Sequence, residues 1–171
     1  LMTYFAAYMI ESYGWDEAST APGLALLGVG AVIGSFAGGG IAGRARRLDW
    51  LAAISLASGV LTGLLFALGA SAWIVVAMAF VASVLVSVSM PVLLTLIMHL
   101  AGQSRGTASG MLSTSNQFGS LVGASAGGLM LSLGGFPAVG LLCLVATVLS
   151  ASVVGLRMRR SPVFQLGAAG T

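Results

Sequence analysis

Two sequence motifs have residue types and spacing that could carry chemistry. The first is Gly38, Gly40 and Gly43, which fit G-x-G-x-x-G, a pattern whose glycines let the backbone approach a pyrophosphate. That pattern must follow a short strand and open a helix, with an acidic residue about 20 positions further on. Here the glycines end an apolar stretch, and Gly63 occupies the position of the acid. The sequence therefore argues against nucleotide binding.

The second motif places Ser125 in G-x-S-x-G, with His99 as the only histidine that could act as its base. Ser125 lies about 18 residues, or about 27 Å, into its helical stretch, whereas His99 belongs to the end of the preceding one. A base must lie within about 3 Å of its nucleophile. With one Cys, one His and no acid inside the apolar stretches, metal ligands are also lacking. We expect no enzyme activity, no metal and no cofactor.

The composition indicates which elements position these residues. The 171 residues are 58% hydrophobic and 6% charged, with a mean hydropathy of +1.05, whereas about a quarter of the residues of soluble domains are charged. Charge-free apolar stretches of 18 or more residues predict membrane spans. We expect an all-α polytopic membrane protein with helices at about 21–42, 51–70, 73–99, 107–133 and 136–156, a partial helix at 1–13, and a disordered cytoplasmic tail at 161–171. The half-length first helix and the initial Leu predict that the chain is a fragment or a mature remnant.

The charges predict the orientation. If residues 1–10 leave the membrane, all seven arginines fall on one side, in residues 44–49, 101–105 and 157–160. Glu11, Asp16 and Glu17 fall on the other side. Because Lys and Arg in short loops mark the cytoplasmic face, we expect a multi-pass protein of the inner (plasma) membrane with cytoplasmic arginine loops. The net charge of +3 does not predict nucleic-acid binding, since the arginines are spread over three loops without an aromatic platform.

Two glycine series predict close helix packing. Gly30, Gly34 and Gly38 recur every four residues, and a second series is formed by Gly119, Gly123 and Gly127. Small residues at this spacing form a ridge that another membrane helix can approach closely.

Two turns carry a resemblance to a known family. Residues 39–47, GGIAGRARR, are similar to the second copy of the basic cytoplasmic loop signature of major facilitator superfamily (MFS) transporters, with Gly43 in the place of the usual Asp and Arg46 in the place of a usual Gly. The matching residues of that loop are Gly39, Gly43, Arg44, Arg46 and Arg47. Residues 105–110, RGTASG, are similar to the turn that opens helix 11, through Arg105, Gly106 and Gly110. The chain resembles the C-terminal half of such a transporter, from the end of helix 7 through helix 12.

The resemblance implies a fold of two six-helix halves, with the substrate bound near the midplane between them and alternating access by rocking. Residues 1–160 would form the C-terminal bundle, in which helices 7, 8, 10 and 11 face the cavity and helices 9 and 12 face lipid. The implied partners are the lipid bilayer, a small-molecule substrate and the N-terminal half of the same transporter. An efflux permease for hydrophobic or amphipathic compounds, proton-coupled by family, is the expectation. The alternatives are a self-contained six-helix protein acting as a homodimer, or an inactive truncated fragment.

Polar residues in the span that starts at Thr107 form one stripe. Ser109, Ser113, Asn116 and Ser120 fall within about 60° of one another, and Gln117 lies about 40° beyond. An unpaired amide in hydrocarbon costs several kcal/mol. Asn116 and Gln117 therefore either line the substrate path or form hydrogen bonds between helices, and the sequence leaves both alternatives open.

A second stripe, Ser83, Ser87, Pro91, Thr95 and His99, recurs every four residues, and Pro91 predicts a bend. The bend either faces the cavity or is a static kink satisfied by its neighbours, and His99 is either a proton relay or an interfacial surface residue. In the first segment Tyr4 and Tyr8 share a face that belongs either to the cavity or to an aromatic belt. The candidate substrate-path residues are Tyr4, Tyr8, Ser87, Pro91, Thr95, Ser113, Asn116, Gln117 and Ser120.

Overall fold

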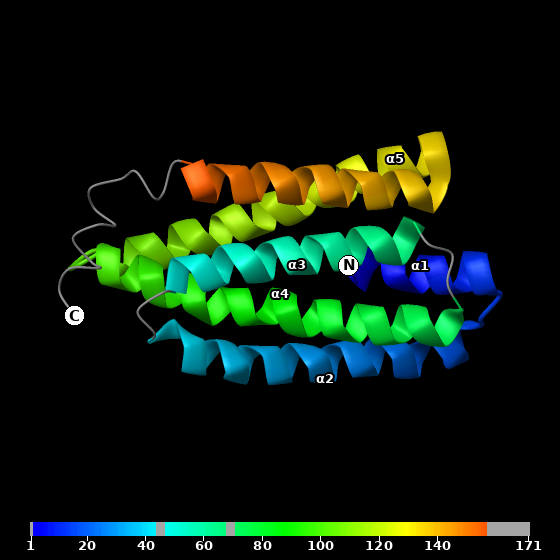
Figure 1. Ribbon diagram of the computed structural model, residues 1–171, viewed down its shortest axis with the longest axis horizontal. Helices are drawn as coiled ribbons and strands as arrows, with labels where there is room; N and C mark the ends of the chain where they lie inside the picture. The colour runs from blue at the N-terminus through cyan, green and yellow to red at the C-terminus, as the bar shows by residue number, and fades with distance from the viewer. Residues whose placement is uncertain (1, 44–46, 68–70, 157–171) are drawn as a thin grey trace.

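The structure, a computed structural model, describes residues 2–43, 47–67 and 71–156. Within these ranges the chain forms α-helices joined by short turns and no strand, which confirms the predicted all-α fold. The elements are α1 (Met2–Tyr13), α2 (Glu17–Ala42), α3 (Arg47–Ala67), α4 (Ala72–Leu100) and α5 (Arg105–Leu156), as Figure 1 shows. Arg44, Arg46 and the predicted tail at 161–171 lie outside the described residues.

Helix α5 consists of two arms that fold back on each other. Its backbone leaves helical geometry at Gly134 (φ −149°, ψ 16°) and Gly135 (φ 67°, ψ −162°). The positive φ of Gly135 is a conformation that glycine adopts without steric cost. This turn separates a first arm, residues 105–133, from a second arm, residues 136–156, and the two expected helices at 107–133 and 136–156 fall on either side of it.

Helix α2 begins at Glu17, four residues before the expected start, because Asp16 caps it. The backbone N–H of Ser19 donates a hydrogen bond of 2.9 Å to Asp16 Oδ1, and the Thr20 hydroxyl donates one of 2.9 Å to the Asp16 carbonyl. Side-chain acceptors at this position satisfy N–H groups that the first turn of a helix leaves unpaired. The hydrogen bonds from Ser19 hold the pKa of the Asp16 carboxyl below its usual value.

Three of the described helices are long and apolar enough to cross a membrane, judged by length and composition: Glu17–Ala42, Ala72–His99 and Arg105–Val153. The last of these contains both arms of α5. The stretch Trp50–Phe66 in α3 is apolar but shorter. The five spans expected from the sequence therefore correspond to α2, α3, α4 and the two arms of α5.

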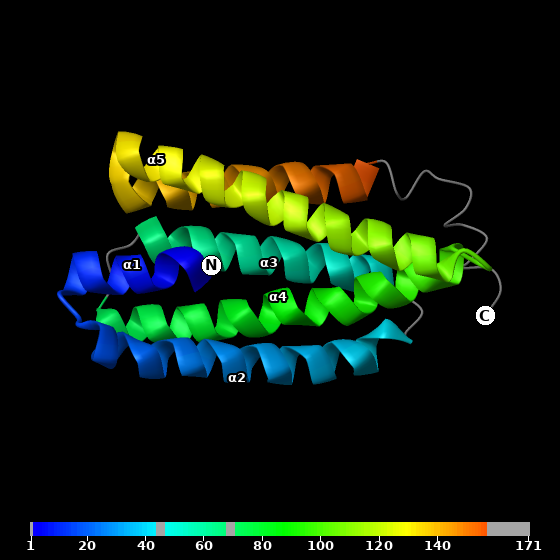
Figure 2. The same ribbon diagram turned by 180° about the vertical axis from the view of Figure 1, so that it is seen from behind.

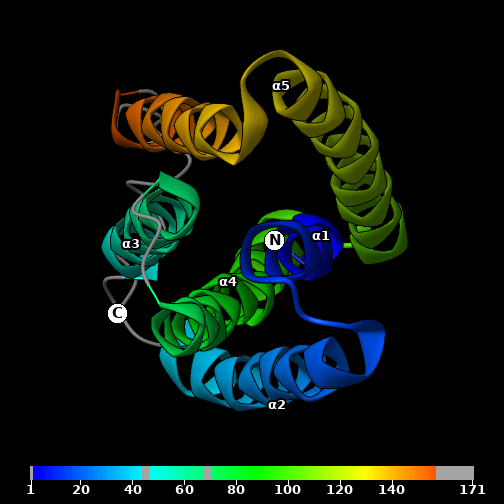
Figure 3. The same ribbon diagram turned by 90° about the vertical axis from the view of Figure 1, so that its right-hand side faces the viewer.

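Successive helices run back and forth, so the turns gather at two ends of the bundle (Figures 1 and 2). At one end, here called the arginine end, α2 and α4 finish and α5 begins with Arg105. At the other, the acidic end, lie Asp16 and Glu17 at the start of α2 and the turn at Gly134 and Gly135. Seen along the bundle, α1 lies near the centre and α4 slants toward it from beside α2 and α3, with the arms of α5 on the other sides (Figure 3).

The predicted glycine ridge on α2 is confirmed as the contact surface for α4. A Cβ added at Gly34 would collide with the backbone carbonyl of Val84, and one added at Gly38 would meet the carbonyl of Val88 at 2.5 Å. Gly30 lies beside Phe80 in the same way. The two backbones approach this closely because no side chain separates them. Helices α2 and α4 form the most extensive helix pair of the described chain.

A second close pair joins α3 to the second arm of α5. Gly59 lies against the side chain of Thr147, and Gly63 lies against Leu144. The hydroxyls of these helices bond to carbonyls of their own helix: Ser58 to Ser55, Thr62 to Ser58, Thr147 to Cys143 and Ser152 to Val148. These hydroxyls need no partner outside their helix, so the pair is compatible with a lipid environment.

Aromatic rings fill the core near the acidic end. The Tyr8 ring packs edge-on against Phe66, Phe136 and Tyr13, at centroid distances of 5.2, 4.8 and 5.6 Å. Trp15 and Trp73 form a further edge-on pair at 5.8 Å. Edge-on aromatic pairs contribute about 0.5 to 1.5 kcal/mol beyond the area that they bury. This cluster joins α1 to α3 and to the second arm of α5.

Candidate functional site

The polar stripe predicted on the first arm of α5 is open to its surroundings. Ser113, Asn116, Gln117 and Ser120 are all exposed. None of them has a hydrogen-bond partner among the residues that the structure describes. Large apolar side chains on the same arm are exposed as well: Met111, Phe118, Leu121 and Val122. Along most of its length, this arm has no protein neighbour within the described chain.

The amides of Asn116 and Gln117 decide what can surround this arm. Each amide offers two donors and an acceptor, and burying them unpaired in hydrocarbon costs several kcal/mol. Apolar neighbours can face lipid, but these two side chains require water, a polar ligand or another polypeptide segment. The two alternatives left open by the sequence, a substrate path and hydrogen bonds between helices, both meet this requirement. If the two amides form hydrogen bonds between helices, the partner helix lies outside the described residues.

Tyr4 joins α1 to the first arm of α5. It is half-buried, and its hydroxyl donates a hydrogen bond to the backbone carbonyl of Ala124. Its ring lies against Gly127, where an added Cβ would come within 2.7 Å of it. Asn116, Ser120 and Ala124 recur every four residues and therefore share one face of the arm. The face that contacts Tyr4 thus continues the polar stripe, which brings Tyr4 and the stripe to one side of α5.

Tyr8, the other tyrosine candidate, lies elsewhere. Its side chain is 3% exposed, inside the aromatic cluster. One turn of α1 therefore separates a tyrosine that faces the first arm of α5 from one that fills the core. A contact between Tyr8 and a substrate stays a prediction with no support from this packing.

Part of the stripe on α4 packs against α2, and the rest lines a cavity. The buried Ser83 hydroxyl donates a hydrogen bond of 2.7 Å to the Leu27 carbonyl of α2. Ser87 lies next to Gly34 of α2, and Pro91 is half-buried. Thr95 is half-buried and lines a cavity at the arginine end. Ser83 and Ser87 thus hold α4 on α2, and only the last two turns of the stripe face open space.

The two motif turns occupy the arginine end. Gly43 caps the end of α2 with φ −85° and ψ −2°, and Arg47 is the first residue of α3. Arg105 opens α5, and its side chain is exposed. No atom lies within 4 Å of where a Cβ would stand at Gly39, Gly43, Gly106 or Gly110. These four glycines therefore make no close helix contact within the described chain.

The second glycine series is only partly occupied within the described chain. Gly127 packs on Tyr4, but no described atom lies within 4 Å of a Cβ built at Gly119 or Gly123. Packing of another helix on Gly119 and Gly123 therefore stays a prediction for a segment outside the described residues. The structure also shows a pair that the sequence analysis missed, Gly59 and Gly63 on α3. The signal was present, since they have the same four-residue spacing as the ridge on α2.

Within the described ranges the structure brings together no set of groups suited to bond-making chemistry. The Ser125 hydroxyl donates a hydrogen bond of 2.9 Å to the Leu121 carbonyl of its own helix. His99 lies at the end of α4, its Nδ1 2.9 Å from the Thr95 carbonyl oxygen. The described residues contain no group of three His, Cys, Asp or Glu side chains that could hold a metal ion. The open polar stripe with Tyr4 is thus the candidate site, and it is suited to binding.

A comparison with known protein families finds a match over nearly the whole chain. The family model described as Major Facilitator Superfamily matches residues 1–169 of the chain. Neither a curated protein nor a solved structure matches it.

Proposed function

The chain belongs to the major facilitator superfamily of membrane transporters, and we propose that it is the C-terminal half of an exporter of small amphipathic compounds. In this proposal the exposed stripe on the first arm of α5 lines the substrate path. Alternating access by rocking against a second six-helix half would open that path to one side and then to the other.

The observation that carries the proposal is the pair of exposed amides, Asn116 and Gln117, which have no hydrogen-bond partner among the described residues and stand beside large apolar side chains. Amides are costly to leave in hydrocarbon and useful in a path, because they can exchange hydrogen bonds between water and a passing ligand. The hydroxyls of Ser113, Ser120 and Tyr4 lie along the same side and would extend the polar surface. Their neighbours Phe118 and Leu121 supply apolar surface to an amphipathic substrate.

The substrate class follows from the charges near the stripe. From residue 106 to residue 156 the sequence contains no Asp, Glu, Lys or Arg. A strongly ionic substrate would find no counter-charge along this arm, whereas a neutral amphipathic compound needs none. The proposal includes coupling to protons, which is inferred from membership of the family. The acids Glu11, Asp16 and Glu17 lie toward the acidic end, so a proton-carrying carboxylate is expected in the other half.

A homodimer is the alternative that the exposed arm also allows. A second copy of the chain would then supply the surface opposite the stripe. Cross-linking separates the two arrangements. A cysteine at exposed Gln117 in a Cys143→Ser background should form no disulfide dimer in an exporter whose other half is part of the same polypeptide.

The test of the proposal is a transport assay on the complete polypeptide with Asn116→Ala and Gln117→Ala. Export of an uncharged amphipathic dye from loaded vesicles should fall about tenfold, while the amount of folded protein stays within a third of the parent. Ser125→Ala is the matched control, because that hydroxyl is on the same arm but bonds only to its own helix. Parallel losses of transport and folded protein in the amide variants would show that the amides hold helices together, and would contradict the proposal.

A further inference from the structure

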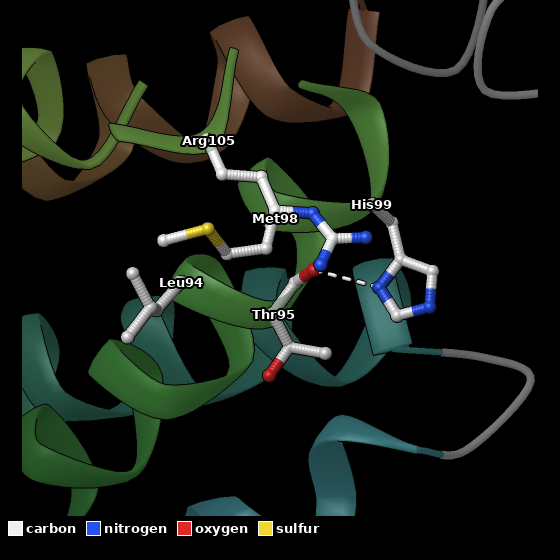
Figure 4. Close-up of a pocket in the computed structure, with 5 residues that line it drawn as sticks. All are labelled: Leu94, Thr95, Met98, His99 and Arg105. Carbon is white, nitrogen blue, oxygen red and sulfur yellow. Dashed lines mark hydrogen bonds between the residues drawn. The ribbon is translucent and has the colours of Figure 1, made fainter. Parts of the chain in front are cut away.

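A cavity of about 370 Å³ lies at the arginine end, where α4 finishes and α5 begins. Its lining residues are Leu94, Thr95, Met98, His99 and Arg105, and Figure 4 shows their side chains. None of the residues of the polar stripe of the first arm lines this cavity, and the nearest of them, Ser109, lies about one turn beyond Arg105 along α5. The cavity therefore calls for an explanation of its own.

The rim of the cavity is polar and cationic. Arg105 is exposed, and its guanidinium has neither a hydrogen bond nor an ion pair with any residue in the described ranges. The His99 ring is held in place by the contact of Nδ1 with the Thr95 carbonyl oxygen, 2.9 Å away. A guanidinium offers five donors in a fixed fork that matches the oxygens of a phosphate. The rim is thus suited to an anion.

The wall below the rim is apolar. Leu94 is 41% exposed, and Met98 is half-buried one turn above it. Leu94 lies about 7.5 Å deeper along α4 than His99, at 1.5 Å per residue. In a membrane protein this depth takes the wall from the headgroup region into the hydrocarbon. A soluble anion gains nothing from such a wall, whereas a lipid places its phosphate at the rim and its acyl chain below.

We propose that this cavity binds an anionic phospholipid, with its headgroup phosphate on Arg105 and an acyl chain along Leu94 and Met98. Basic pockets between membrane helices are suited to anionic headgroups. The lipid would sit between the end of α4 and the start of α5 and fix the angle at which the first arm leaves the bundle. This inference goes beyond the proposed function, because the lipid stays bound and is not the transported compound.

The experiment measures lipid that stays with the purified complete polypeptide. The protein is taken from vesicles of equal parts phosphatidylglycerol and phosphatidylcholine, and its retained lipid is counted by native mass spectrometry. We expect the parent to retain phosphatidylglycerol in preference. Arg105→Gln and Leu94→Gln should each lower that retention about fivefold.

Two matched variants control for general effects. Leu56→Gln changes a leucine on α3 that is also 41% exposed, and Arg44→Gln removes an arginine from another loop. Both should leave the retention of phosphatidylglycerol unchanged. Arg44→Gln acting as strongly as Arg105→Gln would mean that net charge alone attracts the lipid, and would overturn the proposal. So would equal retention in all variants.

Two further measurements keep the result interpretable. Arg105→Lys keeps the positive charge and should disturb folding less than Arg105→Gln. This variant should retain more than half of the lipid. Retention as low as in Arg105→Gln would count against pairing with a phosphate. Inorganic phosphate in millimolar excess should not displace the lipid, and full displacement would identify a site for soluble anions instead. Lipid retention is measured without transport, so it stands or falls separately from the export proposal.

Discussion

The Tyr4 hydroxyl donates its hydrogen to the backbone carbonyl of Ala124, 120 positions away in the sequence, and so joins α1 to the first arm of α5. The ring of the same tyrosine rests on Gly127. Elsewhere most side chains of this arm are exposed. Tyr4 therefore helps to set the distance between α1 and the stripe of polar residues, while Met130 and Leu131 further along the arm pack against the core.

Replacing Tyr4 by Phe should destabilise this junction only modestly. The Ala124 carbonyl lies inside a helix and keeps its helical hydrogen bond, so the loss is one interhelical bond, worth about 0.6 to 2 kcal/mol in membrane proteins. We expect Tyr4→Phe to lower the thermal midpoint of the purified protein by a few degrees. Tyr4→Ala also removes the ring from Gly127 and should lower it further. Ser125→Ala serves as the control, and a Tyr4→Phe midpoint equal to that of this control would contradict the role of the bond.

Gly34 should tolerate no side chain. A Cβ there would overlap the carbonyl of Val84 and crowd Ser87, and backbone atoms cannot move aside as a flexible side chain can. Overpacking a well-packed contact costs about 1 to 3 kcal/mol, and forcing two backbones apart costs at the upper end or beyond. We expect Gly34→Ala to lose most of its folded protein, measured as the monodisperse fraction in size-exclusion chromatography.

Gly39 provides the control on the same helix. It is exposed, and a Cβ built there meets no atom within 4 Å. Since Ala favours a helix over Gly by about 0.8 to 1 kcal/mol, Gly39→Ala should leave the folded fraction unchanged or slightly higher. An equal loss of the folded fraction in Gly34→Ala and Gly39→Ala would show that these glycines are needed for backbone conformation and not for close packing.

Acid should weaken the start of α2. Hydrogen bonds from Ser19 hold the pKa of Asp16 below 3.8, so the folded helix favours the carboxylate. A carboxyl whose pKa is lowered by folding stabilises the folded state above its unfolded pKa, and this contribution is lost as the pH falls through the folded pKa. Hydrogen-exchange protection of the first turn of α2, corrected for intrinsic rates, should therefore fall below about pH 3.8. Asp16→Asn keeps a capping acceptor without the charge, and its protection should not change over the same range.

The helices were predictable because each signal, apolar composition or glycine spacing, lies within a single segment of the sequence. Charge-free stretches indicated the spans, and the four-residue spacing of Gly30, Gly34 and Gly38 indicated the contact surface of α2. Helix α2 starts four residues before the expected position 21, because Asp16 caps it through Ser19 and a charge-free stretch does not include the capped turn. Whether a ridge is occupied depends on where the partner helix runs. Gly119 and Gly123 have the same spacing but meet no described residue, so packing of another helix on them stays a prediction.

The candidate site was only half predictable for a similar reason. Helical periodicity places Asn116 and Ser120 on one face, but it cannot say which helix lies opposite that face. Tyr4 and Tyr8 have equivalent positions one turn apart on α1. Tyr4 contacts the first arm of α5, whereas Tyr8 is buried in the core because it packs against the aromatic rings of Phe66 and Phe136. Those rings belong to α3 and to the second arm of α5, so only the folded chain brings them to Tyr8.

The loop arginines should orient the chain in the membrane. Replacing Arg44, Arg46 and Arg47 together by Ala removes three of the seven cations and should weaken the retention of that loop in the cytoplasm, because positive charges in short loops set topology. We expect a mixed orientation in the variant, with little change of substrate affinity in the molecules that insert correctly. The measurement is the side from which engineered cysteines react with a membrane-impermeant maleimide.

Reporter cysteines at two exposed loop positions make this readout direct. In a Cys143→Ser background, a cysteine at Gln103 reports the arginine end, and one at Ser71 reports the acidic end. In the parent each should react from one side only, and in the triple variant both should react from both sides. Neutralising Glu11 and Glu17 is the matched control, because acidic residues contribute little to orientation. One-sided labelling that survives the loss of all three arginines would place the topological signal elsewhere in the chain.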